Sequence, residues 1–326
     1  MRKILVTGAA GFLGSHLCET LIAHGHKIVG VDNFFRGTRE NIAQLSPESF
    51  TIFDLDLSTP TAVSHLHSLL NEHNIETVIH LAAVNGTQYF YDHPTFVLHQ
   101  NTTISMHVLQ AIADTSVTKI LYASSSEVYG DPTLIPTPES HPIILNAHAD
   151  RDSYASSKAI GDFYTRLFAK QYNIDFLIFR IFNLYGERMV NTRYGQVIPE
   201  FVQRMLFENE FTILGNGEHS RSFCYIKDAT NIITTLLHKN ITGFINVGND
   251  EEITINELAK TIHVVANKEF TPRYLPARPH DHKRRRPDLT RLRDIIPDLR
   301  YTPLTEGLKR VISFYETTQP VKEQAT

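Results

Sequence analysis

The 326-residue sequence has little of what marks a secreted, membrane-spanning or nucleic-acid-binding protein. Its two cysteines, Cys18 and Cys224, are far apart and form neither a metal-binding spacing nor a disulfide framework, which favours a reducing, cytoplasmic location. No apolar run approaches the ~18 residues that a membrane-spanning helix needs, so we expect no membrane partner. The net charge of −4 gives no overall attraction for nucleic acid, and we expect none as a partner.

What the sequence does contain is an alternation of apolar, strand-like runs and helical segments through its first half. With 42% hydrophobic and 20% charged residues, the chain can bury a large core. The alternation predicts an α/β fold with a doubly wound parallel sheet of the Rossmann type, whose ligands lie beyond the carboxyl ends of the strands. The predicted strands are residues 2–6, 27–31, 50–53, 77–83, 119–123 and 176–182.

The alternation becomes irregular after the sixth of these strands, which indicates a second, smaller domain. One more buried-type strand, residues 243–248, is expected to return to the sheet, so the smaller α/β domain is interleaved with the first. The expected division is 1–182 with a return segment at about 223–248 for the Rossmann-type domain, 183–222 and 249–318 for a substrate domain, and 319–326 for a polar, frayed tail.

The first strand leads directly into a glycine-rich turn that opens a helix. Gly8, Gly11 and Gly14 form a variant of the G-x-G-x-x-G motif. Glycines let backbone N–H groups approach a pyrophosphate, and the N-terminus of the helix adds partial positive charge. The turn, which includes Phe12 and Leu13, is therefore predicted to bind a dinucleotide.

The end of the second strand indicates which dinucleotide binds. A carboxylate at Asp32 can accept hydrogen bonds from the adenosine ribose hydroxyls and repel a 2′-phosphate, which favours NAD over NADP. Arg36 lies close by in the sequence, so NADP remains an alternative cofactor.

Two further strand ends are candidates for contacts with the cofactor. Asp54, followed by Leu55, is expected to face an adenine amino group; the alternative is that Asp56 or Ser58 only caps the next helix at this point. Small residues at the end of the fourth strand permit close approach of the cofactor; the strand ends in Leu81, Ala82 and Ala83.

Tyr154 and Lys158 are four residues apart and share one face of a predicted helix. A lysine ammonium beside a phenol stabilises the phenolate, so we expect Lys158 to lower the pKa of Tyr154. Such a tyrosine can take a proton from a sugar hydroxyl while a hydride passes to a nicotinamide. A hydroxyl among Ser124, Ser125 and Ser126, at the end of the preceding strand, can hold the same substrate oxygen.

These motifs together resemble the extended short-chain dehydrogenase/reductase superfamily, in particular its NAD-dependent nucleotide-sugar epimerases and dehydratases, from Ile4 to about Phe314. The resemblance implies NAD as cofactor and a catalytic triad of Ser125, Tyr154 and Lys158. It also implies NAD contacts from Asn33, Asn101 and Ser124. The residues that carry it are 7–14, Asp32-Asn33, 80–83, 124–130, Tyr154, Lys158, 180–183 and 284–288.

The same resemblance implies a nucleotide-sugar substrate, most simply one linked to UDP. Asn183 would touch the sugar or its phosphate, and Gln196 with Val197 would bracket the nucleotide base. Arg221 and Arg285 would bind the diphosphate through charge-assisted hydrogen bonds. The basic run that contains Arg285 is otherwise explained as a solvated surface.

Members of this superfamily share a first step, oxidation at C4 of the sugar, and then diverge. Many 4,6-dehydratases carry Asp-Glu where this chain has Ser126-Glu127, whereas Ser-Glu resembles the UDP-glucuronate decarboxylases. The Ser-Pro-Ala-Ser segment of the decarboxylases is replaced here by residues 84–87, Val-Asn-Gly-Thr. We favour a UDP-sugar epimerase, with a UDP-hexuronate as one candidate substrate; a UDP-glucuronate decarboxylase and an NDP-sugar 4,6-dehydratase are the alternatives. Glu127 is a candidate proton shuttle or a buried structural carboxylate.

A non-catalytic NAD-binding sensor is a further alternative, but such proteins typically lack the tyrosine or the lysine, and both are present here. We also expect a homodimer. Family members pair the two helices that correspond to residues 101–113 and 154–172, and Phe163, Leu167 and Phe168 lie beyond one face of the second helix. Packing within one chain explains these apolar residues almost as well.

Overall fold

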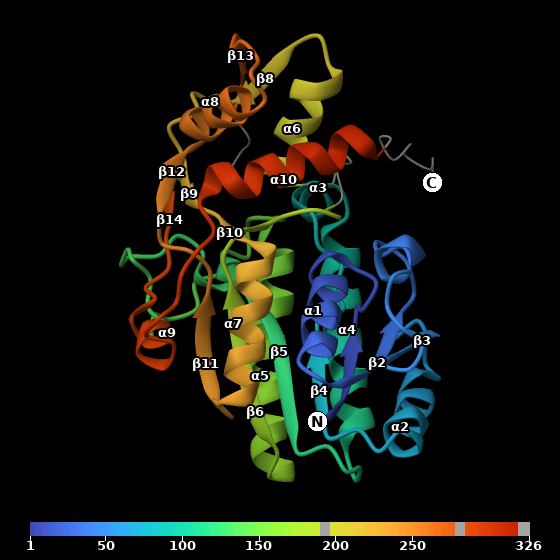
Figure 1. The fold of residues 1–326 in the computed structure, drawn as a ribbon. Coiled ribbons are helices and arrows are strands. Elements are labelled where there is room, and N and C mark those ends of the chain that lie inside the picture. The colour runs from blue at the N-terminus through green and yellow to red at the C-terminus, as the bar shows by residue number, and fades with distance from the viewer. Residues whose placement is uncertain (190–195, 278–283, 319–326) are drawn as a thin grey trace.

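A seven-stranded parallel sheet forms the centre of the fold (Figure 1). The computed structural model describes residues 1–189, 196–277 and 284–318; the expected tail at 319–326 lies outside them. The strand order is β11-β6-β5-β4-β1-β2-β3, so the predicted doubly wound fold is confirmed. The strands are β1 (Lys3–Thr7), β2 (Lys27–Asp32), β3 (Phe50–Asp54), β4 (Thr77–His80), β5 (Lys119–Ser125), β6 (Asp175–Ile181) and β11 (Gly243–Val247).

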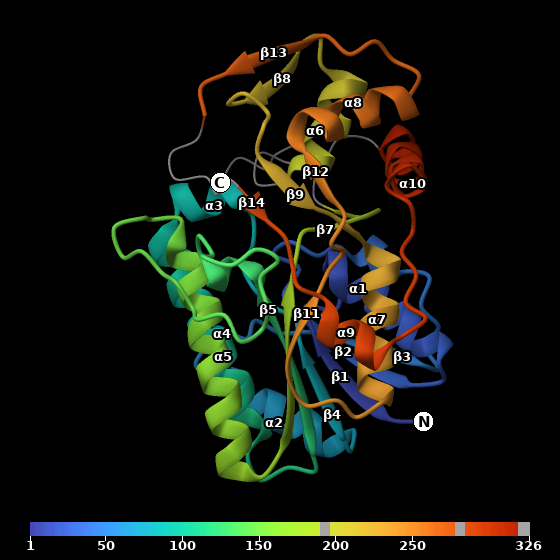
Figure 2. The same ribbon diagram turned by 90° about the vertical axis from the view of Figure 1, so that its left-hand side faces the viewer.

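The central strands are apolar throughout because helices cover both faces of the sheet. On one face lie α1 (Phe12–Ala23) and α7 (Ile226–His238). On the other lie α2 (Ala62–Glu72), α4 (Pro94–Ile112) and α5 (Asp152–Tyr172), as Figure 2 shows. Among the described residues, no helix is long and apolar enough to cross a membrane.

The connection order reverses between β1 and β4, which lie side by side with their carboxyl ends at the same edge. Such a reversal leaves a crevice where ligands bind in sheets of this kind. The strand expected at 243–248 is β11, and it pairs in parallel with β6. The chain therefore leaves the sheet after β6 and returns to it before its C-terminal segment.

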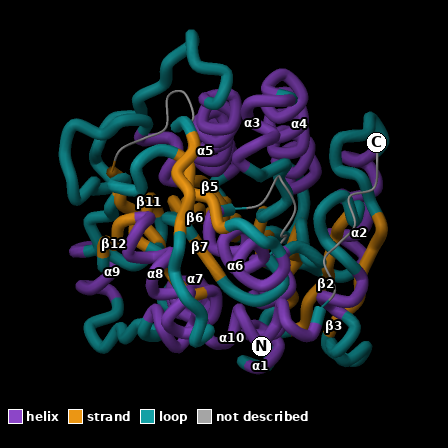
Figure 3. Tube along the Cα trace, turned by 90° about the horizontal axis from the view of Figure 1, so that it is seen from above, coloured by secondary structure: helices purple, strands orange, loops and turns teal. Residues whose placement is uncertain are grey.

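A smaller group of elements lies above the carboxyl edge of the sheet, at the top of Figure 1 and toward the viewer in Figure 3. Its main helices are α6 (Val197–Phe207), α8 (Ile255–Val265) and α10 (Leu304–Thr317). Thr254 and Glu257 form a reciprocal capping box at the start of α8. Its short strands are β7 (Leu184–Tyr185), β8 (Phe211–Leu214), β9 (Ser220–Ser222), β10 (Cys224–Tyr225), β12 (Glu252–Thr254), β13 (Pro272–Leu275) and β14 (Arg284–Arg285). The other short elements of the chain are α3 (Thr87–Asp92), α9 (Thr290–Ile295), which packs beside β11, and the 3-10 turns η1 (Arg39–Ile42) and η2 (Ser126–Tyr129).

Candidate active site

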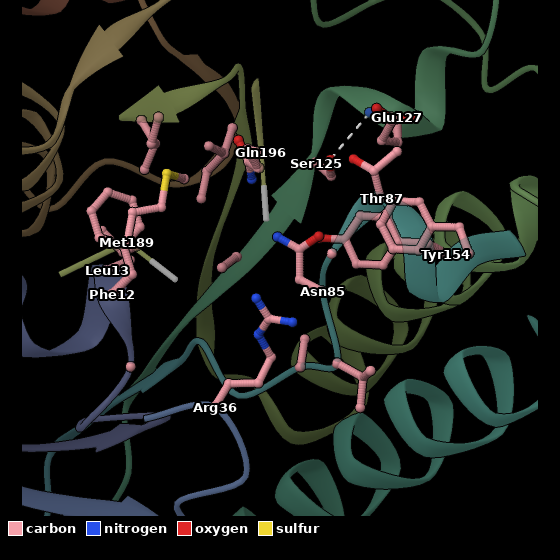
Figure 4. A pocket seen from close by; sticks show the side chains of 18 of the residues that line it. Phe12, Leu13, Arg36, Asn85, Thr87, Ser125, Glu127, Tyr154, Met189 and Gln196 are labelled. Carbon is pink, nitrogen blue, oxygen red and sulfur yellow. Dashed lines mark hydrogen bonds between the residues drawn. The ribbon is translucent and has the colours of Figure 1, made fainter. Parts of the chain in front are cut away.

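One cavity of about 550 Å³ runs from the glycine-rich turn, along the carboxyl ends of the strands, to the smaller domain. Figure 4 shows side chains from both domains converging on it. Most residues predicted from the sequence line it: Gly8, Gly11, Phe12, Leu13, Gly14, Asp32, Asn33, Arg36, Leu55, Leu81, Ala82, Ala83, Ser124, Ser125, Ser126, Glu127, Tyr154, Lys158, Asn183, Gln196, Val197, Arg221 and Arg285.

The glycine-rich turn is too tight for side chains at its key positions. Gly8 has a φ of +70°, and a Cβ on Gly14 would lie 1.9 Å from the Gly8 carbonyl oxygen. The Gly11 amide donates to that same oxygen at 3.1 Å, and α1 begins at the next residue. The turn thus presents backbone and a helix N-terminus to the cavity, which fits the diphosphate of a dinucleotide.

Asp32 closes the second strand and is held by the turn. Its Oδ2 accepts a hydrogen bond from the Ala10 amide at 2.9 Å, and its Oδ1 accepts one from the Phe34 amide at 2.8 Å. Burial raises the pKa of this carboxyl, and the backbone donors oppose that shift. The carboxylate is thereby fixed at the edge of the cavity, where a ribose would meet it.

The structure corrects the prediction for Asp54. This carboxylate does not line the cavity; it pairs with Arg39 at 3.0 Å, and both side chains are more than 60% exposed. The cavity wall is formed instead by the residues that follow, Leu55 to Ser58. Asp56 Oδ1 accepts hydrogen bonds from the Ser58 amide at 2.8 Å and hydroxyl at 2.7 Å, which closes a local turn; neither residue caps α2, whose N-cap is Thr61. Two aspartates lie near this strand end, and the sequence pattern did not distinguish them.

Asn101 also differs from its predicted role. It is 3% exposed and does not line the cavity. Its Oδ1 accepts from the Val84 amide at 2.7 Å, and its Nδ2 donates to the Val84 carbonyl at 3.0 Å and to Ser157 Oγ at 3.2 Å. Asn101 therefore fixes the loop after β4 against α5 and acts on the site only through that loop.

The three triad residues meet at the middle of the cavity. Ser125 ends β5, while Tyr154 and Lys158 lie in the first turns of α5. Lys158 Nζ donates to the Ala123 carbonyl at 2.9 Å and lies 5.9 Å from the centroid of the Tyr154 ring. The Tyr154 ring stacks on Phe90 of α3, with centroids 4.6 Å apart.

The expected lowering of the Tyr154 pKa is not found in this geometry. Burial raises the pKa of the phenol, the nearby Glu127 carboxylate raises it further, and a hydrogen bond with Ser125 opposes them. Lys158 is itself desolvated, and burial lowers its pKa to about 8 while Asp162 acts in the opposite direction. Its ammonium donates to a backbone carbonyl rather than to the phenol.

Glu127 lies between two arginines on one side of the triad. Its carboxylate accepts hydrogen bonds from Arg285 of β14 and, at 3.3 Å, from Arg151 of the loop before α5. Both arginines are buried, with Arg285 2% and Arg151 6% exposed, whereas the Glu127 side chain is 20% exposed and reaches the cavity. Arg285, predicted to bind a diphosphate, thus lies beside the candidate catalytic carboxylate.

The remaining predicted substrate residues form the upper part of the cavity. Gln196 and Val197 lie at the start of α6, and Asn183 follows β6 and donates to the Ser222 carbonyl at 3.0 Å. Arg221 lies on β9 and donates to the Ser220 carbonyl at 2.8 Å. All four line the cavity, and they come from segments far apart in the chain.

The sequence profile of the NAD dependent epimerase/dehydratase family matches residues 4–248. The chain belongs to this family. UDP-glucuronic acid decarboxylase 1 of Danio rerio is 31% identical over 315 residues, which cover 96% of this chain and 72% of that protein. UDP-N-acetyl-alpha-D-glucosaminuronate decarboxylase of Bacillus cytotoxicus is 30% identical over 322 residues, which cover 96% of this chain and 98% of that protein.

Among solved structures, UDP-N-acetylglucosamine 4-epimerase of Methanobrevibacter ruminantium, in complex with UDP-N-acetylmuramic acid, is similar to this chain. The TM-score is 0.87 at 28% identity, and the match covers 97% of this chain and 98% of that one. As a member of the epimerase/dehydratase family, this protein is an NAD-dependent enzyme. Three features of the cavity are consistent with NAD as the cofactor: the tight glycine-rich turn, the Asp32 carboxylate held by a backbone amide, and the Tyr154–Lys158 pair.

Sequence reasoning missed several residues of this family member's cavity. Arg151 precedes Tyr154 by three positions, but nothing in its local pattern indicates that it reaches Glu127. Asn85 and Thr87 lie after β4 and line the cavity near the triad, in the segment 84–87 that the sequence analysis noted only because it differs from the decarboxylases. Phe90, which stacks on Tyr154, had no expected role. Leu57 also lines the cavity, but at this strand end the sequence analysis assigned a cofactor contact only to Asp54 and Leu55.

Proposed function

We propose that this enzyme is a nucleotide-sugar epimerase that oxidises a UDP-sugar transiently at C4, and that its sugar is a hexuronate. The observation that carries the proposal is the convergence of three features on one cavity. These are the glycine-rich turn of residues 8–14, the Ser125–Tyr154–Lys158 triad and the charged cluster of Glu127, Arg151 and Arg285.

In this proposal Tyr154 takes the proton of the C4 hydroxyl and later returns it. Ser125 holds the same oxygen, and the Lys158 ammonium stabilises the phenolate at a distance. Bound NAD supplies the acceptor for the C4 hydride and the donor for its return. Phe90 stacks on the Tyr154 ring and fixes its plane, which keeps the phenol oxygen directed toward the sugar.

The proposed carboxylate at C6 is suggested by the charges beside the triad. Glu127 is two residues beyond Ser125 and lines the same cavity, so the cluster lies near the sugar that the triad would hold. Two guanidiniums and one carboxylate make the cluster positive, and bidentate guanidiniums match carboxylate geometry. A sugar without a carboxylate would bring no negative charge to these two buried guanidiniums.

A UDP-glucuronate decarboxylase is the second candidate. It is supported by the Ser126-Glu127 pair and by relatives with that activity, such as the Danio rerio protein. Residues 84–87 speak against it, since they lack the Ser-Pro-Ala-Ser of the decarboxylases while facing the triad in this cavity. For a common 4,6-dehydratase, Ser126 stands where an acidic residue is expected.

Proton NMR of the purified protein with NAD⁺ and UDP-glucuronate, UDP-glucose or UDP-N-acetylglucosamine tests the proposal. A new anomeric signal from UDP-glucuronate with all carbons retained is expected. Release of CO₂ with a UDP-pentose product would instead show that the enzyme is a decarboxylase. Tyr154→Phe is the control and should abolish either product; an unchanged product with Tyr154→Phe would overturn the catalytic assignment.

We further propose that the enzyme works as a homodimer in the cytoplasm. The helices α4 and α5 pack side by side on one face of the sheet (Figure 2), and Phe163 and Leu167 of α5 are 54% and 51% exposed. These are one helical turn apart and form a continuous apolar strip. Both cysteines are free and buried, which supports a reducing compartment.

A further inference from the structure

A buried histidine lies between the carboxyl ends of β1 and β4 and the helix α4. His80 is the last residue of β4; it is 1% exposed and does not line the cavity. Its Nδ1 lies 2.7 Å from the hydroxyl oxygen of Thr7, the last residue of β1. Its Nε2 lies 3.3 Å from the hydroxyl oxygen of Ser105 on α4. Each ring nitrogen therefore has one buried hydroxyl as its partner.

The Thr7 hydroxyl determines which ring nitrogen carries the proton. Its oxygen accepts hydrogen bonds from the Leu81 amide at 3.1 Å and from the Ala82 amide at 3.2 Å, so both of its lone pairs are used. The hydroxyl hydrogen remains, and His80 Nδ1 is the acceptor that it meets. Because Nδ1 accepts, a neutral His80 carries its proton on Nε2.

The partner of Nε2 leads to the same tautomer independently. The Ser105 hydroxyl donates to the Asn101 carbonyl at 2.8 Å, so its oxygen is left to accept a hydrogen bond. A proton on His80 Nε2 supplies the donor.

The surroundings of His80 keep the ring neutral. The Tyr122 ring of β5 lies 5.6 Å from the His80 ring, and the Lys158 ammonium lies 5.1 Å from the centroid of the same tyrosine ring. Burial, and to a smaller degree the Lys158 charge, lower the pKa of His80 to about 3.

The hydrogen bonds continue from Asn101 to the helix that carries the triad. Asn101 holds the Val84 backbone, and its Nδ2 donates to the Ser157 hydroxyl at 3.2 Å. That hydroxyl donates in turn to the Tyr154 carbonyl at 2.7 Å. The helices α4 and α5, which carry these residues, pack side by side (Figure 2). We call this buried series the His80 chain; it consists of Thr7, His80, Ser105, Asn101 and Ser157.

The other end of the His80 chain borders the glycine-rich turn. Gly8 follows Thr7, and a Cβ on Gly8 would lie 2.9 Å from the Ala82 amide nitrogen. That amide donates to the Thr7 hydroxyl, so the same contact sets how closely the segment after β4 approaches the turn. The His80 chain thus runs from the start of the turn to the backbone of Tyr154.

We propose that His80 is a positioning residue that holds the glycine-rich turn and Tyr154 in a fixed relation, and that it does so as the neutral Nε2–H tautomer. Loss of either hydrogen bond of the ring would let the end of β4 shift relative to α5, although every side chain that lines the cavity would remain. The role is the same whichever sugar reaction the enzyme performs.

Nitrogen-15 NMR of protein labelled at its histidine rings tests the tautomer in the original chain, with His80→Asn used to assign the signal. His80 should show a protonated Nε2 and an unprotonated Nδ1, unchanged from pH 8 to pH 5. His263 is the internal reference for the opposite tautomer, because its Nδ1 faces the Ala259 carbonyl at 2.8 Å. A protonated Nδ1 in His80 would overturn the proposal, and so would an imidazolium in this pH range.

Calorimetry with NAD⁺ on nucleotide-free variants tests the positioning role. His80→Leu removes both hydrogen bonds and should weaken NAD⁺ binding about tenfold. His80→Asn keeps an acceptor for Thr7 and His80→Gln keeps a donor for Ser105, so each should recover part of the affinity. If His80→Leu binds NAD⁺ as tightly as the original protein, or if neither polar variant binds better than His80→Leu, the positioning role is wrong.

A double-mutant cycle tests whether the His80 chain acts as one unit. Thr7→Val and Ser157→Ala change its two ends, and their effects on NAD⁺ affinity should deviate from additivity by about twofold. In the His80→Leu background the same pair should be additive, because the connection is already broken. Additive effects in the original background would contradict the proposal.

His67→Gln is the matched control for the histidine variants. His67 lies on α2, away from the ends of β1 and β4, and its Nδ1 contacts the Ala111 carbonyl of α4 at 3.1 Å. This variant should bind NAD⁺ like the original protein. A loss as large as that of His80→Leu would assign the effect to general destabilisation and overturn the proposal.

Discussion

At the scale of single residues, Lys158 carries a buried charge, and its effect on the free energy of unfolding can be measured. Burial lowers its pKa from 10.5 to about 8, so the folded protein binds fewer protons than the unfolded chain between these values. The free energy of unfolding contributed by this group therefore rises with pH above 8, and below pH 8 the ammonium destabilises the fold. Catalysis, by contrast, requires the charged form.

Lys158→Met should therefore raise the free energy of unfolding at pH 7 while abolishing turnover. The difference between the variant and the original protein should shrink from pH 8 to pH 9.5, since the original loses its buried charge over that range. Urea denaturation at each pH measures this difference, and the comparison cancels the contributions of other titrating groups. A variant less stable at pH 7 would contradict the account of Lys158.

Arg151 gives a second prediction at this scale. If the cluster with Glu127 and Arg285 binds a sugar carboxylate, Arg151→Gln should weaken binding of UDP-glucuronate about tenfold and leave UDP-glucose nearly unchanged. Glu127→Gln should change the preference in the opposite direction, because it removes a competing carboxylate. Calorimetry with Tyr154→Phe as background avoids turnover. Equal losses for both sugars would remove the hexuronate from the proposal.

Single residues also show where sequence reasoning fails. The Tyr154–Lys158 pair and the glycine-rich turn follow from the sequence because spacing within a single segment determines their geometry, whereas Ser125, on another element, was assigned by the resemblance to the superfamily. Asp54 and Asp56 lie two apart, and only the turn after β3 decides that the second reaches the cavity wall. The Glu127–Arg285 contact joins positions far apart in the chain, which no local pattern contains.

At the scale of elements, the exposed strip on α5 is the feature that predicts assembly. Phe163→Glu with Leu167→Glu should convert a dimer into a monomer at micromolar concentration, because charges would be buried in the proposed interface. Sedimentation velocity measures the outcome, and Lys170→Glu, also exposed near the end of the helix, is the control. An original protein that sediments as a monomer would contradict the proposed dimer.

Elements differed in how well the sequence predicted them. The long strands and helices of the sheet follow from apolar runs and helical periodicity, and even β11 was found in the second half of the chain. The strands β9 and β14 have three and two residues, too few for a pattern. They form only because their neighbours bring them together, and they place Arg221 and Arg285.

At the scale of the whole molecule, three buried histidines make the fold sensitive to acid. Burial, the largest cause in each case, lowers the pKa of His16 and His26 to about 4 and that of His80 to about 3. Each must stay neutral in the folded protein; His26, for example, accepts the Arg2 amide through Nδ1 at 3.2 Å and faces His238. The unfolded chain takes up these protons near pH 6.5.

The free energy of unfolding should therefore fall as the pH decreases from 6.5 toward 4. His26→Gln should make this fall less steep, because one group that must charge on unfolding is removed. His65→Gln, at an exposed position on α2, should leave the slope unchanged. Thermal melts between pH 4 and 7 measure both variants, and equal slopes in all three proteins would contradict the assignment to His26.

Reversible hydride transfer at C4 of the sugar is the central step of the proposed reaction. The most direct test uses UDP-glucuronate deuterated at C4 with the NAD-loaded enzyme, followed by mass spectrometry and NMR of the product. We predict that the product keeps deuterium at C4, even after many turnovers in ordinary water, because the hydride leaves and returns without contact with solvent. Replacement of the label by solvent hydrogen at C4 would contradict a hydride that leaves and returns without contact with solvent.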